Sequence, residues 1–378
     1  MVKVLHCADV HLDAPFVCGS ASKSELRRNE LLASFSKMMN YVKMNGIDLV
    51  LISGDLFESE NVTRDTAALV QREFADNPRC RFVISPGNHD PYTSESVYAK
   101  LEFPKNVYIF KDTSVSCFSF EDINVDVYGY AFTSKELSYN PFKNVRPRSN
   151  SKINLLCAHG DLNASGSVSC PISVDDIRES GFDYVALGHI HLGHEIPEKA
   201  NDTFYAYSGC LEGRDFGECG IKGAFYWEFE KDRCELTKAE YKKLRFCKRR
   251  YEIEKINVFG AKNMSDILPR VKACIEEKGY NRDTLLRVVL EGDVSPELVI
   301  SNSAFSMLED MVFYLEIKNK TRPFLNIESL ENDPTIRGAF YEKLKPLLES
   351  EDENERALAY ASLKYGLSAL SGNNVVDY

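Results

Sequence analysis

Short apolar runs that end in polar clusters recur through the first two thirds of the chain. Each run is rich in Val, Ile, Leu or Phe, which is typical of buried strands. The runs are Lys3–Cys7, Leu49–Ile52, Phe82–Ile84, Ile153–Cys157 and Tyr184–Leu187. Helical patterns fill the early gaps, over Glu30–Lys43 and Thr63–Phe74. This order predicts an α/β fold, in which functional groups gather at the carboxyl ends of the strands.

After Phe110 the pattern changes to an alternation of apolar and polar residues, which is typical of antiparallel hairpins. The alternating segments are Val115–Phe120, Ile123–Tyr130, Thr203–Tyr207, Gly223–Glu230 and Cys234–Tyr241. An α/β half followed by a β-rich half indicates two packed sheets with helices outside. We therefore expect a four-layer αββα sandwich of mixed α/β (α+β) class over residues 1–243.

A basic run marks the end of this domain. Six of the nine residues from Lys242 to Arg250 are Lys or Arg. A solvated linker is the favoured interpretation, and a DNA-contacting patch is the alternative. Residues 250–320 are predicted to form a small α+β domain, with a helix over Met264–Glu277 and strands over Tyr251–Phe259, Leu285–Leu290 and Met311–Ile317.

Residues 321–378 are expected to form a linker and two amphipathic helices. Residues 320–334 contain two prolines and little periodicity, which is typical of a linker. The apolar faces of the helices contain Ile336, Phe340, Leu344 and Leu348 in the first and Leu363, Leu367 and Leu370 in the second. The acidic segment Glu349–Glu355 connects them. These faces could pack on their own domain or dock a partner, and the pattern leaves both open.

The polar clusters at the strand ends supply candidate metal ligands. Nitrogen and oxygen donors without thiolate suit two divalent ions such as manganese, iron or zinc. The candidates are Asp9, His11, Asp55, Asn88, His159, His189 and His191. Asp55 stands alone at its strand end and is the best candidate to bridge two ions. The set predicts a binuclear hydrolase, in which water activated by metal attacks phosphorus.

His89 remains uncommitted to metal in this scheme. It could stabilise the developing oxyanion or protonate the leaving oxygen, and is therefore the predicted catalytic histidine. Asp90 is predicted to assist it by fixing the tautomer of its ring. A lone D-x-H or H-G pair more often consists of ordinary polar surface residues than of metal ligands. The prediction therefore depends on the presence of all five blocks, each after a strand and in this order.

Composition and charge modify this interpretation. The net charge of −11 argues against a nucleic-acid substrate, because proteins that bind phosphate backbones usually do so through a basic surface. Two bound metals would offset up to about four charges locally. The 11 cysteines form no C-x-x-C pair, which favours a reducing, cytoplasmic location. We find no apolar run long enough for a membrane span and no signal-peptide layout.

The ordered blocks D-x-H, G-D, G-N-H-D, H-G and G-H-x-H resemble those of the calcineurin-like metallophosphoesterase superfamily. Within it, the chain is similar to the SbcD-type DNA repair exonucleases, particularly the YhaO-like branch. The stretches that carry this narrower resemblance are His6–Phe16, Gly87–Pro91, Phe103–Val107, Tyr207–Gly209, Phe216–Glu218 and Lys222–Gly223. The similarity covers residues 1–240 well and the remainder only in layout.

The resemblance implies a four-layer fold with the seven candidates above as metal ligands and His89 as the catalytic residue. It further implies two metal ions, usually manganese, and DNA as substrate. The expected partner is an SbcC-like or YhaN-like coiled-coil ATPase, docked where the terminal helices lie. Residues 250–320 would correspond to the DNA-capping domain of the family. A homodimer is left open.

One residue departs from the nuclease pattern. After Gly54-Asp55-Leu56-Phe57, some nuclease members carry a second histidine that assists exonuclease chemistry, whereas this chain has Glu58. A carboxylate beside an incoming phosphate would repel it. A DNA phosphodiesterase is therefore the leading hypothesis. A small-molecule phosphodiesterase or phosphatase on the same site is the runner-up, and a catalytically weak scaffold subunit of an ATPase complex is the third.

Overall fold

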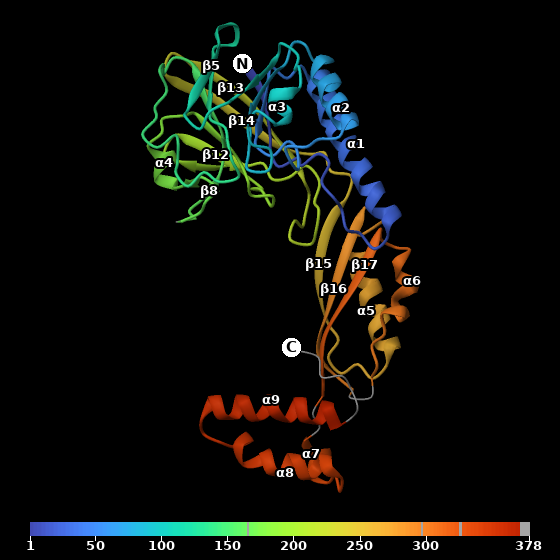
Figure 1. Cartoon of the computed structure of the whole chain (residues 1–378). Helices are drawn as coiled ribbons and strands as arrows, with labels where there is room; N and C mark the ends of the chain where they lie inside the picture. Colours follow the sequence, from blue (N-terminus) through green and yellow to red (C-terminus); the bar gives the residue numbers. More distant parts are fainter. Residues whose placement is uncertain (165, 296–297, 325–326, 371–378) are drawn as a thin grey trace. The chain divides into compact units, whose positions relative to one another are not determined.

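A computed structural model describes residues 1–164, 166–295, 298–324 and 327–370 (Figure 1). The chain divides into two compact units, Met1–Tyr251 and Glu252–Tyr378, which we describe separately. No helix within the described ranges is both long enough and apolar enough to cross a lipid bilayer.

The first unit contains two six-stranded sheets. The first sheet has the spatial order β14 (Glu235–Arg245), β13 (Gly223–Asp232), β1 (Val2–Cys7), β2 (Leu49–Ser53), β3 (Arg81–Ser85) and β4 (Val107–Ile109). The second has the order β11 (Glu198–Ala200), β12 (Thr203–Tyr207), β10 (Tyr184–Gly188), β7 (Ile153–His159), β6 (Val125–Gly129) and β5 (Ser116–Phe120). The central strands of both sheets run parallel, so their carboxyl ends share one edge.

An apolar core fills the space between the two sheets. It joins Val4 and Leu51 of the first sheet to Leu155 and Ala186 of the second, and it includes the buried Trp227. The helices α1 (Ala21–Asn45) and α2 (Arg64–Ala75) cover the outer face of the first sheet through a second core. A third core lies against the outer face of the second sheet, together with the short helix α4 (Val174–Arg178). The predicted four-layer sandwich is therefore confirmed.

The remaining elements of this unit are short: α3 (Val97–Lys100), the 3-10 turn Glu121–Ile123, β8 (Asp161–Leu162) and β9 (Pro171–Ile172). Helix α1 begins nine residues before the predicted start at Glu30, because the Ser20 hydroxyl accepts a hydrogen bond from the Lys23 amide and caps the helix.

The predicted hairpins are correct for β5–β6 and β13–β14. The segment β12 differs, because it pairs in parallel with β10 as well as antiparallel with β11.

The basic run is not simply a solvated linker. Its first four residues, 242–245, belong to β14. The Lys243 ammonium donates to the carbonyls of Ser208 and His194, at 2.6 and 3.0 Å. Arg249 forms an ion pair with Glu30 of α1, with Nη2 2.5 Å from Oε1. Pairing between strands and these long-range contacts override the local pattern, so part of the run has a structural role.

The second unit contains a three-stranded sheet in the order β15 (Arg250–Asn257), β16 (Thr284–Val294) and β17 (Tyr314–Pro323), with β15 beginning at the end of the first unit. Helix α5 (Met264–Glu277) has the predicted bounds. It packs on the sheet through Ile267, Val271 and Ile275, next to the 3-10 turn Asn302–Phe305 and α6 (Ser306–Glu309).

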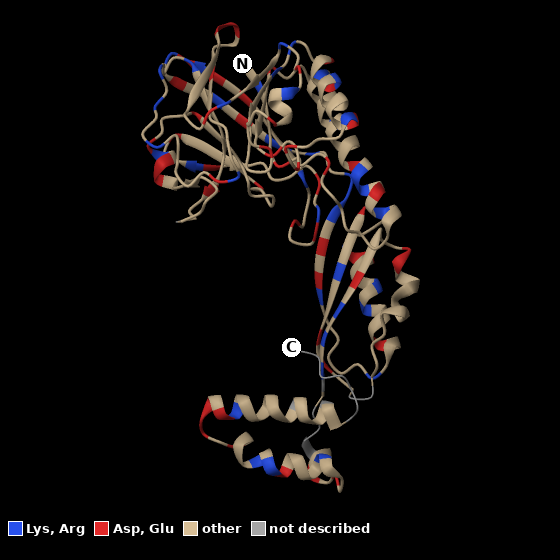
Figure 2. Cartoon of the chain, viewed as in Figure 1, with Lys and Arg blue, Asp and Glu red and all other residues tan. Residues whose placement is uncertain are grey.

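Three further helices follow, α7 (Ile327–Glu331), α8 (Ile336–Leu348) and α9 (Glu353–Leu370). Helix α7 and the end of β17 lie inside the segment predicted as a linker, of which residues 325–326 are outside the described ranges. Phe340, Leu344 and Leu348 pack with Leu363 and Leu367 in a small core of their own. In Figure 2 the acidic connector between α8 and α9 is the red loop.

Candidate metal centre

Five strand ends from the two sheets meet at one edge of the sandwich. Asp9, Asp55 and Asn88 follow β1, β2 and β3 of the first sheet, and His159 and His189 stand at the ends of β7 and β10 of the second. Because parallel strands deliver their carboxyl ends to the same edge, residues far apart in sequence converge there.

The glycines of the motifs permit the two sheets to approach each other closely at this edge. A Cβ on Gly188 would lie 1.7 Å from the Ser53 carbonyl oxygen of the facing sheet. A Cβ on Gly54 would lie 2.1 Å from Nδ1 of His159, and Gly54 also has a φ of +87°. Space therefore restricts both positions to glycine, and backbone conformation adds a second restriction at Gly54.

Four of the candidate ligands have a strained backbone. The φ angles of Asp9, His11, Asp55 and His189 are 50°, 50°, 52° and 109°. Residues with side chains rarely adopt positive φ, and each instance costs on the order of 1–3 kcal/mol. Strain of this kind persists where the surrounding structure enforces it, and its concentration here marks this edge as a functional site.

Asp9, His11 and His191 form the first candidate metal pocket, with ligand atoms within 4.8 Å of one another. His11 Nδ1 lies 2.8 Å from Glu58 Oε2, and His191 Nδ1 lies 2.5 Å from Glu218 Oε1. The carboxylates place the proton of each neutral ring on Nδ1. Both Nε2 atoms then present lone pairs to each other across 3.1 Å, an arrangement that fits a cation between them.

The second candidate pocket is formed around His159. Its Nδ1 lies 2.9 Å from the Ser53 carbonyl, which can only accept, so Nε2 carries a lone pair. This Nε2 faces Asn88 Oδ1 at 2.9 Å, and two facing acceptors again fit a cation. Asp55 Oδ2 lies 3.4 Å from His159 Nε2 and 3.7 Å from His11 Nε2, so its carboxylate is placed between the two pockets.

His189 takes part through both its backbone and its ring. Its amide donates to the two carboxylate oxygens of Asp9, at 3.0 and 3.1 Å. Its ring centroid lies 5.2 Å from that of His159, and its Nε2 lies 3.9 Å from Asp161 Oδ2. All seven predicted ligands thus gather at this edge.

Burial and mutual charge favour the protonation states that bind metal. Burial lowers the pKa of His11 and of His189, so both rings are neutral at physiological pH. Burial opposes ionisation of Asp55, but the facing rings of His159 and His11 lower its pKa. The site thus provides two neutral imidazoles, those of His11 and His189, near an ionised carboxylate.

His89 lies beside the first pocket with its ring 4.8 Å from that of His11. Its Nδ1 faces the Glu58 carbonyl at 3.2 Å. The prediction that Asp90 orients this ring is wrong. The Asp90 carboxylate accepts instead from the amides of Gly87, Asp55 and Phe57, at 2.8, 3.2 and 3.1 Å, and from the Tyr98 hydroxyl at 2.6 Å. It therefore fixes the loops that carry the ligands.

A cavity of about 340 Å³ opens next to His89. Its lining is polar, with three glutamates and one lysine, and contains Glu58, Ser59, Glu60, Asn61, Asn88, His89, Glu95 and Lys135. A ligand of limited size that approaches the site by this route would meet three carboxylates and one ammonium group.

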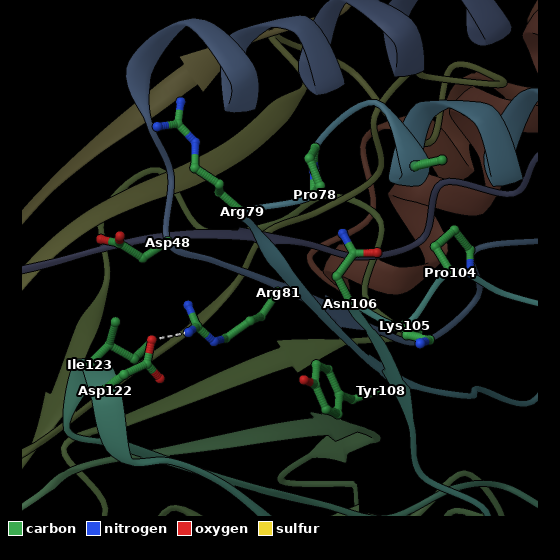
Figure 3. A pocket seen from close by; sticks show the side chains of 11 residues that line it. Asp48, Pro78, Arg79, Arg81, Pro104, Lys105, Asn106, Tyr108, Asp122 and Ile123 are labelled. Atoms are coloured by element: carbon green, nitrogen blue, oxygen red, sulfur yellow. Dashed lines mark hydrogen bonds and ion pairs between the residues drawn. The ribbon is translucent and has the colours of Figure 1, made fainter.

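A larger cavity of about 680 Å³ lies at the opposite edge of the first sheet (Figure 3). Asp48 precedes β2 and Arg81 begins β3, whereas the candidate ligands follow the other ends of these strands. Arg81 is paired with Asp122 across this cavity. None of the predicted site residues lines it, so size alone does not identify the candidate site.

Three residues that carry the geometry were not assigned a role from sequence. Glu218 contacts His191, Arg214 contacts Glu58, and the Lys222 ammonium donates to the His191 carbonyl at 3.2 Å. Glu218 and Lys222 lie within stretches that carried the family resemblance. Spacing along the chain does not reveal which of their side chains turn toward the ligands.

Comparisons with known proteins agree with this geometry. The sequence pattern of the family described as "Calcineurin-like phosphoesterase" matches residues 2–193. The chain is 27% identical to the "Uncharacterized metallophosphoesterase YhaO" of Bacillus subtilis, over 78% of this chain and 73% of that protein. It is 23% identical to the "DNA double-strand break repair protein Mre11" of Saccharolobus solfataricus (85% and 83% covered) and 22% identical to that of Methanopyrus kandleri (77% and 68%).

Proposed function

Because this chain belongs to the calcineurin-like phosphoesterase family, we propose that it is a metal-dependent phosphodiesterase that cleaves DNA. The observation that carries the proposal is the convergence of the seven predicted ligands at one edge of the sandwich, with the ring of His89 4.8 Å from that of His11. Potential metal-binding groups there are Asp9–His11–His191 and Asp9–Asp55–His159, and a third joins His89 to His11 and Glu58. The similarity to two Mre11 proteins named for DNA double-strand break repair supports DNA as the substrate.

Asp9, His11 and His191 would hold one divalent ion, and Asn88, His159 and His189 the other, with Asp55 between them. We propose manganese, with iron or zinc as alternatives. When bound, the two ions supply Lewis-acid activation of the attacking water and of the phosphate. The carboxylates behind His11 and His191 and the carbonyl behind His159 hold these three rings in place before the ions arrive.

His89 would be the proton donor to the leaving oxygen. The Glu58 carbonyl can only accept, so Nδ1 of His89 carries a proton directed to it. When the ring is protonated, Nε2 also carries a proton, which it can deliver to the leaving oxygen or direct toward its developing charge. Asp90 acts at a distance from this step, by holding the amides of Gly87 and Asp55.

The His89→Ala variant tests this role. We expect kcat to fall by about 10²–10⁴-fold, the usual contribution of a positioned acid, while manganese affinity is retained. The matched control is His194→Ala, because His194 contacts Glu198 and no predicted ligand through its side chain. Turnover of single- and double-stranded DNA by the purified protein with manganese measures the effect. Unchanged turnover in His89→Ala would contradict the assignment.

A small-molecule phosphodiesterase is the second candidate, favoured by the three glutamates in the lining and the modest volume of the cavity beside His89. A panel of DNA, cyclic nucleotides and bis-p-nitrophenyl phosphate separates the two. Hydrolysis of the small esters with DNA left intact would exclude DNA as the substrate.

We further propose that the α8–α9 pair docks a coiled-coil ATPase partner. Part of the apolar surface of these helices stays exposed after they pack together. Ile336 and Leu358 are 67% and 70% exposed, although Leu363 and Leu367 are buried between the helices. Association with the ATPase, measured by analytical ultracentrifugation, should weaken in Leu358→Asp, and unchanged association would exclude this surface.

A further inference from the structure

The first pocket is supported by two carboxylates. Glu58 Oε2 and Glu218 Oε1 face the Nδ1 atoms of His11 and His191, at 2.8 and 2.5 Å. Carboxylates behind metal-binding imidazoles fix the ring orientation and raise the basicity of the opposite nitrogen.

Arg214 links the two carboxylates. Its Nη1 lies 3.0 Å from Glu58 Oε2, and its Nε lies 3.5 Å from Glu218 Oε1. Its own amide donates to Glu218 Oε2 at 2.7 Å, and its carbonyl accepts from the Tyr251 hydroxyl at 2.8 Å. Arg214 Nη2 also lies 3.0 Å from His191 Nδ1, but Glu218 is nearer to that nitrogen. We call Glu58, Arg214 and Glu218 the clamp.

The second pocket lacks a comparable support. Nδ1 of His159 faces a neutral backbone carbonyl, that of Ser53. The Nε2 atom of His189 lies 3.9 Å from Asp161 Oδ2, which is beyond hydrogen-bond distance, and Asn88 is a neutral ligand. By contrast, two carboxylates and one guanidinium of the clamp lie behind the rings of the first pocket. The two pockets therefore differ in the charged groups that support their rings.

We propose that the clamp positions His11 and His191 and makes their pocket the tighter of the two, so that it takes up the first metal ion. Glu58 is then a positioning residue for a metal ligand, and Arg214 neutralises it. This removes much of the repulsion that a free carboxylate at this position would exert on a phosphate. The inference rests on the proposed two-metal site.

Calorimetric titration of the metal-free full chain with Mn²⁺ tests the proposal. We expect two binding steps of unequal affinity in the native protein. Glu58→Gln and Glu218→Gln should each weaken the first step by about tenfold to a hundredfold, the usual effect of removing a partner behind a metal ligand. Asn88→Ala should remove the second step and leave the first.

The matched control is Glu60→Gln. Glu60 lines the same cavity as Glu58, but its carboxylate accepts from the Thr93 hydroxyl at 2.8 Å and is in none of the potential metal-binding groups among the described residues. The Glu60→Gln variant should bind its first Mn²⁺ ion with an affinity within about twofold of the native value, because Glu60 supports no ligand. Electron paramagnetic resonance adds a second readout: one equivalent of Mn²⁺ should give an uncoupled signal, and two equivalents a spin-coupled one.

The possible failures are distinguishable. A native protein that binds no Mn²⁺ would overturn the two-metal site itself. The native protein could instead show two binding steps that none of the three variants changes, namely Glu58→Gln, Glu218→Gln and Glu60→Gln. This result would overturn the clamp but leave the two-metal site standing. Loss of the tight step in Asn88→Ala would reverse the order of the pockets. If Glu58→Gln lowers the metal-free melting temperature, Glu58→Asp, one methylene shorter with its charge kept, takes its place.

Discussion

Two lysines, the buried Lys222 and the half-buried Lys243, secure the segment that carries His191. Lys222 donates to the carbonyls of His191 and Leu192, at 3.2 and 3.3 Å, and Lys243 donates to those of Ser208 and His194. Burial lowers the pKa of Lys243 to about 8. The Lys243 ammonium donates hydrogen bonds to two carbonyls that are not paired with a neighbouring strand. Its charge loses part of its hydration when it takes this position.

This pKa shift predicts how stability depends on pH. Since the pKa of Lys243 is lower in the folded than in the unfolded chain, the unfolded chain binds more protons between pH 8 and 10.5. The free energy of unfolding should therefore rise with pH across this window, by on the order of 2–3 kcal/mol from this group. Urea unfolding of the metal-free protein at several pH values should show this increment, and Lys243→Met should lose it.

The control for this experiment is Lys242→Met, which replaces the exposed neighbouring lysine. It should keep the native slope of stability against pH. Equal slopes in the native protein and in Lys243→Met would contradict the assignment.

At the scale of elements, the turn after β2 joins the two sheets. The amide of Asp9 donates to the Gly54 carbonyl at 3.1 Å, and that of His11 donates to the Asp55 carbonyl at 2.9 Å. These bonds hold the segment after β1 against the segment after β2. Gly54 also lies directly against the ring of His159 from the second sheet. The spacing of the sheets thus sets the spacing of the ligands.

The variant Gly54→Ala should disrupt this junction. Its Cβ would meet His159 at 2.1 Å in a backbone with φ of +87°. Gly220 has the same φ with no atom within 4 Å of a Cβ, so Gly220→Ala is the matched control for backbone strain alone. Both should lose about 1–2 kcal/mol through strain, and Gly54→Ala about 1–3 kcal/mol more through overpacking. Urea unfolding followed by Trp227 fluorescence measures both, and equal losses would contradict the argument.

At the scale of the whole molecule, all seven candidate ligands belong to the unit Met1–Tyr251. Binding to the folded state alone stabilises it by about 2.7 kcal/mol per site when free ligand is a hundred times the dissociation constant. A metal ion should therefore stabilise this unit and leave the other unchanged.

Chelation of the metal should accordingly lower the unfolding midpoint reported by Trp227, the one tryptophan of the chain, which lies in the core of this unit. Amide hydrogen exchange should accelerate in β1, β2, β7 and β10. Protection in β16 and β17 of the other unit should stay the same. A uniform loss of protection in both units would contradict confinement of the metal site to the first.

Much of this molecule follows from local sequence. The apolar runs predicted the central strands, and α5 has the span of its helical pattern. The ligand types, their order and their place after strands also follow from the sequence, because a strand and its terminating loop are determined by residues adjacent in the chain. The prediction of a catalytic role for His89, the histidine next to Asn88, rests on the same local pattern.

The partners of these residues were decided only by the tertiary structure. Glu58 lies 156 positions from Arg214, and the sheets must pack before the two can meet. Asp90 is adjacent to His89 in sequence, yet its carboxylate turns away from it to buried amides that would otherwise lack an acceptor. Sequence by itself therefore determined which atoms could bind metal. The packing of two sheets decided which groups stand behind them, because side-chain direction and long-range contact are properties of the fold and not of the local pattern.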